Sequence, residues 1–406
     1  MPSEFAPHWT LDPGTVFLNH GSFGATPRRV LAAQAEWRER MEQEPVGFFA
    51  RDLEPAMDEA RAALGAFVGA DPDDLALVPN ATAGINIVAR SLDLRPGDEV
   101  VALDHAYNAA TNALEHAAAT AGARLVVAHL PFPGATPDLA RDVILDAVTP
   151  RTRLVMIDHV TSATALVLPV AEIVAALASR GVDALVDGAH APGMLDVDIG
   201  AIGAAYYAGN CHKWMSAPKG SGFLHVRRDL QERVRPLAIS HGANTPRPGR
   251  TRFRVEHDWT GTSDPSAYLS IRAAIEFGAS LLPGGWPALR ERNRDLAIRG
   301  RDLLCGALEV DAPAPDSMIG SMASVPLPLV PAWTPVPGPG QYDDPVHAGL
   351  QRHGIQVSVG PWPQRPGNEP WRRVVRFSAA PYVSLSDLEL LAGVLPGVVR
   401  ATARLG

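Results

Sequence analysis

Lys213 is the residue whose type and surroundings point most directly to chemistry. It stands between His212 and Trp214 in a largely uncharged stretch of small and aromatic residues, Tyr206 to Val226. Partial removal from water lowers the pKa of a lysine ammonium toward the range in which the free amine is nucleophilic. Such an amine can form a Schiff base with an aldehyde. The alternative interpretation is an ordinary surface lysine on a loop.

A carboxylate, Asp187, precedes this lysine and follows an apolar run, Val182 to Val186, typical of a buried strand. The carboxyl end of a strand in an open α/β sheet lies on the ligand side. A carboxylate there could pair with the ring nitrogen of pyridoxal phosphate and keep it protonated, so that the ring can accept electrons. The alternative is simple turn chemistry at Asp187 and Gly188.

A third segment, Asp74 to Arg90, predicts a strand, a turn at Asn80 to Thr82, and a helix that opens with small residues. Backbone N–H groups at the helix start, together with the Thr82 hydroxyl, could bind a phosphate. The segment matches neither glycine pattern of NAD-binding or ATP-binding loops, which disfavours those cofactors. Alone it could be an ordinary Asn-capped helix. Each segment alone is a weak signal, but their order along the chain, phosphate turn, aspartate and then lysine, favours a pyridoxal-phosphate site.

Residues 50 to 285 alternate short apolar runs with amphipathic segments, which predicts an α/β fold with a mostly parallel sheet. Helical spacing is clear in Asn108 to Ala121 and in Val170 to Arg180, each followed by a glycine that can end the helix. The predicted strands are Asp74 to Val78, Glu99 to Leu103, Arg124 to His129, Arg153 to Asp158, Val182 to Val186 and Gly222 to Val226.

After about residue 285 the pattern predicts a smaller α+β domain. A charged segment, Trp286 to Leu308, predicts a long helix, and prolines then crowd Pro313 to Pro345. Strand-like residues in and beyond this stretch favour ordered proline-rich loops over a disordered linker. These strand-like segments are Met318 to Leu327, Ile355 to Val359 and Arg373 to Ser378.

The last predicted element is a helix from Ser384 to Leu395, which Pro396 is expected to end. Three parts follow for the whole chain. Residues 1–49 form an N-terminal segment that contributes to the small domain and the active-site mouth, 50–285 form a large cofactor-binding domain, and 286–406 form the small domain.

The composition excludes several classes of function. The 406 residues contain 36 Lys+Arg and 44 Asp+Glu, a formal net charge of -8, with no basic block of the kind that binds nucleic acid. Only two cysteines are present, which excludes a disulfide framework, and no long uncharged apolar stretch predicts a membrane span. We expect a cytoplasmic protein that acts on a small amino-acid-like substrate and requires no metal.

These motifs resemble the class V aminotransferase family of pyridoxal-phosphate enzymes, and most closely its isopenicillin N epimerase-like branch. The resemblance implies pyridoxal 5'-phosphate as cofactor and the fold type I, aspartate aminotransferase-like architecture. The matching stretches are LNHGSFGATP (Leu18 to Pro27), NATAG (Asn80 to Gly84), DHAYNA (Asp104 to Ala109), DHVTSATALVLP (Asp158 to Pro169), VDGAHAPG (Val186 to Gly193), GNCHKWMSAPKGSGFLH (Gly209 to His225), WTGTSD (Trp259 to Asp264) and VRFSAAPY (Val375 to Tyr382).

On this resemblance, Lys213 is the lysine that forms the Schiff base and Asp187 is the partner of the pyridine nitrogen. His190 is expected to hydrogen-bond the phenolic oxygen of the cofactor, with Ser162 close to the ring.

The resemblance also implies how the phosphate is bound. Ala81 and Thr82 are expected to hold it together with Asn210 and His212. Thr262 is expected to reach the phosphate of the neighbouring subunit, which implies a homodimer with shared active sites.

For the substrate, Arg376 matches the arginine that binds the α-carboxylate, since a guanidinium can hold a carboxylate through two parallel bonds. The alternative is a solvated arginine on an edge strand. Asn19, His20 and Ser22 are expected to line the substrate mouth. A neutral His20 imidazole could act there as an acid or base, or select the substrate.

The family does not fix the reaction. Cysteine desulfurases carry a nucleophilic cysteine in a small-domain loop, but the corresponding segment here, Gly354 to Pro363, has none, and Cys211 resembles a packing position. Epimerisation needs Lys213 on one face of the α-carbon and a second acid or base on the other. Tyr107, also expected to stack over the cofactor, is the first choice for that group, and His105 is the second.

Overall resemblance favours epimerisation. Elimination of a carbon–sulfur bond, as in the related hercynylcysteine sulfoxide lyases, is the alternative, and transamination ranks third. A catalytically silent family member that binds the cofactor is the non-enzyme alternative. The segments expected to shape the side-chain pocket are 47–51, 240–244 and 361–366, in which Arg51, His241 and Arg365 could bind a distal carboxylate.

Overall fold

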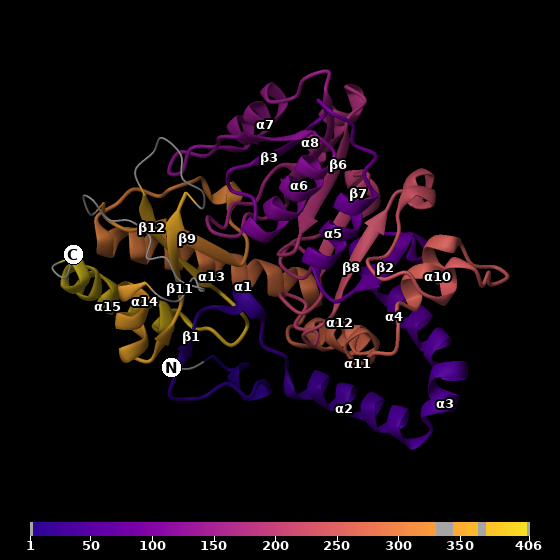
Figure 1. Ribbon diagram of the computed structural model, residues 1–406. Helices are drawn as coiled ribbons and strands as arrows, with labels where there is room; N and C mark the ends of the chain where they lie inside the picture. Colours follow the sequence, from indigo (N-terminus) through magenta and orange to yellow (C-terminus); the bar gives the residue numbers. More distant parts are fainter. Residues whose placement is uncertain (1–2, 330–343, 364–370, 404–406) are drawn as a thin grey trace.

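The computed structural model describes residues 3–329, 344–363 and 371–403, and its main feature is a seven-stranded sheet (Figure 1). The strands are β2 (Leu75–Val78), β3 (Glu99–Leu103), β4 (Arg124–Ala128), β5 (Thr152–Asp158), β6 (Asp183–Gly188), β7 (Tyr206–Asn210) and β8 (Gly222–Val226). Their order is β2-β8-β7-β6-β5-β3-β4. Strands β3 to β7 are parallel and β8 is antiparallel to both of its neighbours. The predicted mostly parallel sheet is confirmed.

Helices cover both faces of this sheet, because successive strand residues point to opposite sides. On β2, Leu75 and Leu77 belong to one apolar core, whereas Ala76 and Val78 belong to another. The first core contains residues of α4 (Leu53–Val68), α8 (Val170–Ser179) and α12 (Ile271–Ser280). The second contains residues of α5 (Ala81–Ser91) and α6 (Asn108–Thr120). Strands buried on both faces explain the Val, Leu and Ala runs of the sequence.

Strand β7 is the one strand of the large sheet that the sequence does not predict. Its residues, YYAGN, include Gly and Asn, which are rare in strands. The segment is nevertheless buried throughout and pairs with β6 and β8. Position within the sheet therefore outweighs local preference here.

A second sheet forms from the C-terminal part of the chain. Its antiparallel strands are β9 (Met322–Pro326), β11 (Ser358–Trp362) and β12 (Arg372–Ser378), in the order β11-β12-β9. Helix α13 (Gly285–Leu308) packs against β9 and against α15 (Leu385–Ala403). The N-terminal segment joins this part through β1 (Val16–Phe17), which pairs in parallel with β10 (Ile355–Gln356), and Figure 1 shows the indigo β1 beside the yellow C-terminal elements.

The prediction that Pro396 ends the last helix is wrong. Helix α15 runs from Leu385 to Ala403 with Pro396 inside it. A proline inside a helix costs about 3 kcal/mol because one hydrogen bond is lost and the ring meets the preceding turn. Burial outweighs that cost here, since apolar residues on both sides of the proline are buried: Leu388, Leu391, Leu395, Val398 and Val399.

No helix in the described ranges has both the length and the apolar character needed to cross a membrane.

Candidate active site

The chemistry-bearing residues gather where neighbouring parallel strands end. Asp158 is the last residue of β5, and its register partner on β6 is Asp187. Lys213 lies in the loop that follows β7 and leads into β8. Because β5, β6 and β7 are parallel neighbours, their carboxyl ends share one edge of the sheet, where open α/β sheets bind ligands.

The Lys213 amine is partly buried and has a neutral partner. Its Nζ lies 3.0 Å from Nε2 of His190. Burial lowers the pKa of Lys213 to about 7; the positive charge of Arg376 acts in the same direction, and the Asp187 carboxylate opposes it. Trp214 donates its indole N–H to His190 Nδ1 at 3.4 Å, which leaves the imidazole proton on Nε2. The His190 Nε2–H can therefore donate to an uncharged Lys213 amine.

The Asp187 carboxylate is almost fully buried. One of its oxygens accepts a hydrogen bond from the Ala189 N–H at 3.0 Å. Burial raises the pKa of Asp187, while this hydrogen bond and the nearby Lys213 charge oppose the rise. The carboxylate thus lies close enough to the amine to interact with it electrostatically.

The predicted phosphate turn is built largely as a capped helix. The Asn80 side chain accepts from the Ala83 N–H at 2.9 Å and caps α5. The Ala81 N–H donates to the Asn210 side-chain carbonyl at 2.8 Å. The Ala81 N–H and the Asn210 side-chain carbonyl thus satisfy each other, and the prediction that Ala81 and Asn210 help to hold the phosphate stays a prediction. Thr82 lies at the helix start, and its role at the phosphate stays a prediction.

Two neighbouring features complete this end of the site. His212 Nδ1 donates to the Ser221 carbonyl at 2.8 Å, which leaves Nε2 for another partner, and burial lowers the pKa of His212 to about 4. Gly222 has no room for a side chain, since a Cβ would lie 2.8 Å from the Gly209 carbonyl oxygen and 2.9 Å from the Asn80 Cα. The start of β8 therefore presses directly on the phosphate turn.

This donor set fits pyridoxal phosphate. A partly buried amine of lowered pKa can bind the aldehyde, and Asp187 offers a carboxylate for the ring nitrogen. His190 offers a ring N–H beside the amine, and the first turn of α5 offers a helix N-terminus for the phosphate.

Arg376 lies on the central strand of the small sheet. Its register partners are Ser358 on β11 and Ser324 on β9, so the alternative of a solvated arginine on an edge strand is wrong. The guanidinium donates to the Ser162 carbonyl at 2.6 Å and to Ser22 Oγ at 2.8 Å. It also donates to Asn19 Oδ1 and to Ser162 Oγ, each at 3.4 Å. The structure thus brings together Arg376, Ser162 and two of the three predicted mouth residues.

His20, the third predicted mouth residue, is bound inside the protein. Its Nε2 lies 2.8 Å from the Lys213 carbonyl oxygen, and its Nδ1 lies 2.8 Å from the Tyr382 hydroxyl. Burial lowers the pKa of His20 to about 4. Both ring nitrogens are engaged, so His20 links the N-terminal turn to Lys213 and Tyr382, which disfavours its use as an acid or base; its place at the substrate mouth stays a prediction.

His105 is likewise disfavoured as a second base. Its Nδ1 lies 2.7 Å from Thr164 Oγ1 and its Nε2 lies 2.8 Å from the Leu130 carbonyl oxygen. Burial lowers the pKa of His105 to about 3, and the ring packs 4.1 Å from Trp362. Tyr107 differs, since its side chain is 43% exposed and its backbone N–H bonds the Asp158 carboxylate at the site. Tyr107 therefore stays the candidate.

Thr262 lies outside this cluster, on a cavity of about 700 Å³ that is lined by none of the residues around Lys213. The cavity also contacts Phe49, Ala50 and His241, which belong to two of the segments predicted to shape the side-chain pocket. Arg51 is exposed and pairs with Glu44 and Asp52, and Arg365 lies outside the described residues.

Sequence reasoning missed the roles of Trp214, Tyr382 and Asp158. Trp214 and Tyr382 act through hydrogen bonds to His190 and His20, which only the folded chain reveals. Asp158 could have been identified from the sequence, because it is the last residue of a predicted strand, just as Asp187 directly follows one. Cys211 is buried and burial raises its thiol pKa, which agrees with its interpretation as a packing residue.

Comparison with known proteins gives one consistent family. The family model described as aminotransferase class-V matches residues 16–391. The isopenicillin N epimerase of Streptomyces clavuligerus is 34% identical over 402 residues, 95% of this chain and 95% of that protein. The L-cysteine desulfhydrase of Arabidopsis thaliana is 31% identical over 344 residues, 81% of this chain and 74% of that protein.

A solved structure supports the fold. It is a C-DES variant with glycine covalently linked to its pyridoxal-phosphate cofactor, with a TM-score of 0.74 and 22% identity. The match covers 94% of this chain and 96% of that chain. At this identity the likeness shows the architecture alone, which is that of the fold type I pyridoxal-phosphate enzymes.

Proposed function

The chain belongs to the aminotransferase class-V family, and on that premise we propose that it exchanges the α-proton of a small amino-acid-like substrate in an isopenicillin N epimerase-like reaction. It is a pyridoxal-phosphate enzyme. The observation that carries the proposal is the partly buried Lys213 amine with a pKa of about 7, held 3.0 Å from a neutral His190. A base with that pKa can both accept and return a proton near neutral pH.

Each remaining residue has a part in this proposal. Bound pyridoxal phosphate supplies a ring that withdraws electrons from the substrate α-carbon. Asp187 holds a proton on the ring nitrogen, and Arg376 binds the substrate carboxylate. Thr82 and His212 hold the phosphate, and His190 hydrogen-bonds the phenolic oxygen. Ser22 and Ser162, already in contact with Arg376, fix the direction of its guanidinium.

Reduction of the purified enzyme with borohydride tests the covalent link. We expect a pyridoxyl label on the peptide that contains Lys213 and loss of the yellow colour. A label on another lysine, or none after incubation with added cofactor, would contradict the assignment.

Epimerisation requires a second acid or base, and Tyr107 is the proposed group. The match to isopenicillin N epimerase covers 95% of both chains, whereas the match to the L-cysteine desulfhydrase covers 81% of this chain and 74% of that protein. The fuller match supports epimerisation over carbon–sulfur bond cleavage. Incubation with single enantiomers of amino acids in deuterated water should give deuterium at the α-carbon and loss of optical activity. A Tyr107→Phe variant should still incorporate deuterium with retained configuration, because Lys213 alone serves one face.

Elimination of a carbon–sulfur bond is the second candidate. It needs only one base, and the structure engages both nitrogens of His105 and of His20, so that Tyr107 alone remains for the second face. Release of pyruvate, ammonia and sulfide from cysteine or its conjugates would favour this reaction. Enantiomer conversion without pyruvate would favour epimerisation.

We also propose a homodimer in which Thr262 serves the site of the partner. Its place on a separate cavity, away from Lys213 of its own chain, supports this arrangement. Light scattering should give the mass of a dimer. Mixed dimers of Lys213→Ala and Thr262→Ala chains should regain part of the activity, because one of their two sites carries neither substitution.

A further inference from the structure

A second buried carboxyl group, Asp158, lies beside the one proposed to hold the ring nitrogen. Asp158 on β5 and Asp187 on β6 are register partners of adjacent parallel strands. Adjacent strands are about 4.8 Å apart, and register partners point to the same side. The side chains are only 2% and 4% exposed, so two acidic groups share one dry edge of the sheet.

The partners of the two carboxyl groups differ. Asp187 accepts from the Ala189 N–H and lies in the field of the Lys213 amine. Two backbone N–H groups, of Tyr107 and of Asp158 itself, act on the Asp158 carboxyl group, and its Oδ2 is buried without a hydrogen-bond partner in the described part of the chain. The next residue, His159, is no counter-ion, because burial lowers its pKa to about 4 and its Nδ1 lies 2.9 Å from the Tyr207 hydroxyl.

Two anions in this place would repel each other with little water to screen them. Among the described residues, the positive group that acts on the pair is the Lys213 amine, and it acts on Asp187. Burial and the Asp187 charge both raise the pKa of Asp158 well above its ordinary value. The proton that the pair retains therefore resides on Asp158, and the negative charge resides on Asp187.

We propose that Asp158 is a positioning residue which stays protonated in the working enzyme, confines the negative charge of the pair to Asp187, and holds the backbone at Tyr107. The inference rests on the proposed roles of Asp187 and Tyr107. A second anion at this edge would stabilise the charged form of Lys213 and so oppose its use as a base. A neutral acid avoids this effect and still accepts the Tyr107 N–H through its carbonyl oxygen.

Asp158→Asn is the discriminating variant, because it has the shape of the protonated acid and cannot ionise. We expect the holoenzyme of this variant to keep its cofactor affinity and the pH midpoint of its visible absorption band within experimental error. Asp187→Asn is the matched control and should lose cofactor affinity at least tenfold. Asp158→Ala removes the acceptor for Tyr107 and should weaken cofactor binding, and the asparagine variant should restore it.

If Asp158 is an anion in the wild type, its replacement by Asn removes a charge beside the site. The band midpoint would then shift by about 1 to 3 pH units, and that result overturns the proposal. The group that shares the face of Asp158 is Asp187, and Lys213 acts on Asp187; their titration must be separated from that of Asp158. His159 and Tyr207, which bond each other on the opposite face of the sheet, are the next titratable groups.

Infrared spectroscopy reads the protonation state directly and without turnover. We expect the wild-type holoenzyme at neutral pH to show the C=O band of a buried carboxylic acid, and Asp158→Asn to lack it. Persistence of that band in Asp158→Asn, or its absence from the wild type, contradicts the proposal. This readout is independent of the reaction, so failure of the proposed function would appear separately, as missing label on Lys213.

Discussion

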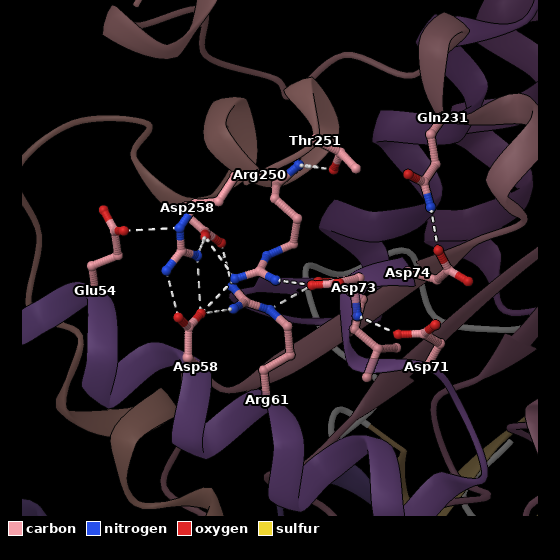
Figure 2. A network of polar contacts seen from close by, with 12 residues as sticks. Glu54, Asp58, Arg61, Asp71, Asp73, Asp74, Gln231, Arg250, Thr251 and Asp258 are labelled. Carbon is pink, nitrogen blue, oxygen red and sulfur yellow. Dashed lines mark hydrogen bonds and ion pairs between the residues drawn. The ribbon is translucent and has the colours of Figure 1, made fainter. Parts of the chain in front are cut away.

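Two buried charged regions of this protein follow opposite rules. One is the active-site edge around Lys213. The other, here named the arginine cluster, consists of Arg61, Arg250 and Arg254 with Asp58 and Asp258, and Figure 2 shows most of it between α4 and the segment around α10 (Arg252–Asp258).

In the arginine cluster nearly every charge meets an opposite charge. Arg61 is fully buried, yet it bonds Asp58 at 2.9 Å, the Leu75 carbonyl at 3.0 Å, and Asp258. At the active-site edge, Lys213 contacts a neutral imidazole, and Asp158 keeps an oxygen without a partner. Compensated charges hold elements together, whereas uncompensated ones shift their pKa and become available for chemistry.

The largest difference between an effect on activity and an effect on stability should appear on removal of Lys213. Lys213→Ala should lower turnover by more than about 1,000-fold, because both the covalent link to the cofactor and the base are lost. The fold should persist, since the amine makes no ion pair with a carboxylate. Steady-state kinetics and circular dichroism measure the two effects. Lys219→Ala, an exposed lysine in the same loop, is the control and should keep full activity. Comparable losses of turnover in Lys213→Ala and Lys219→Ala would contradict the special role of Lys213.

In the arginine cluster, by contrast, a substitution should lower the stability of the fold. Arg61→Met should lower the free energy of unfolding by about 3 kcal/mol, because it removes the fully buried member of two ion pairs and leaves Asp58 and Asp258 each with one arginine fewer. Urea denaturation measures the loss. Arg228→Met is the matched control: this arginine is exposed, pairs with Asp71 and Asp74, and should contribute at most about 1 kcal/mol. Equal losses for the two arginines would show that burial does not govern the cluster.

The sequence predicts the active-site edge better than the cluster, for a physical reason. Lys213 and Asp187 are identifiable because each stands next to a local pattern, a run of apolar strand residues or a stretch of small residues. Their chemistry can be inferred without knowing what lies across the sheet. The residues of the cluster come from distant segments, and each one alone looks like an ordinary surface charge.

The two histidines whose acid or base role the structure disfavours share another property. His20 and His105 look available in the sequence, but each is closed by partners far along the chain, such as Tyr382 and Thr164. Asp158 was overlooked because the adjacency of β5 and β6 depends on strand order, which the sequence does not display. The prediction that Pro396 ends the last helix is wrong because burial of α15 outweighs the cost of a proline inside a helix.

A smaller effect on catalysis is expected at Arg376, a buried arginine whose described contacts are neutral groups. Arg376→Ala should raise KM with a penalty of about 2 to 3 kcal/mol in kcat/KM, because a charge-assisted bond to the substrate carboxylate is lost. Arg376→Lys should recover only part, since lysine cannot hold a carboxylate through two parallel bonds. Kinetics with the amino acid and with its amide separate the carboxylate contact from general damage. An unchanged KM in Arg376→Ala would place the carboxylate elsewhere.

The last effect concerns the pH dependence of stability and tests the uncompensated charge itself. The pKa of Lys213 falls from its ordinary value of 10.5 to about 7 in the folded protein without cofactor. Between these values the unfolded chain binds a proton at this lysine and the folded chain does not, so stability rises with pH across that window.

Comparison with Lys213→Met isolates this contribution, because methionine fills similar space and does not titrate. Below pH 7 both states of the wild type are charged, and the partly buried ammonium lowers its stability relative to the methionine variant by a constant amount. From pH 7 to 10.5 that difference should shrink steadily in urea denaturation of the two cofactor-free proteins. A difference that stays constant across this range would mean that the folded amine titrates like an exposed lysine. The active-site edge would then obey the same rule as the arginine cluster.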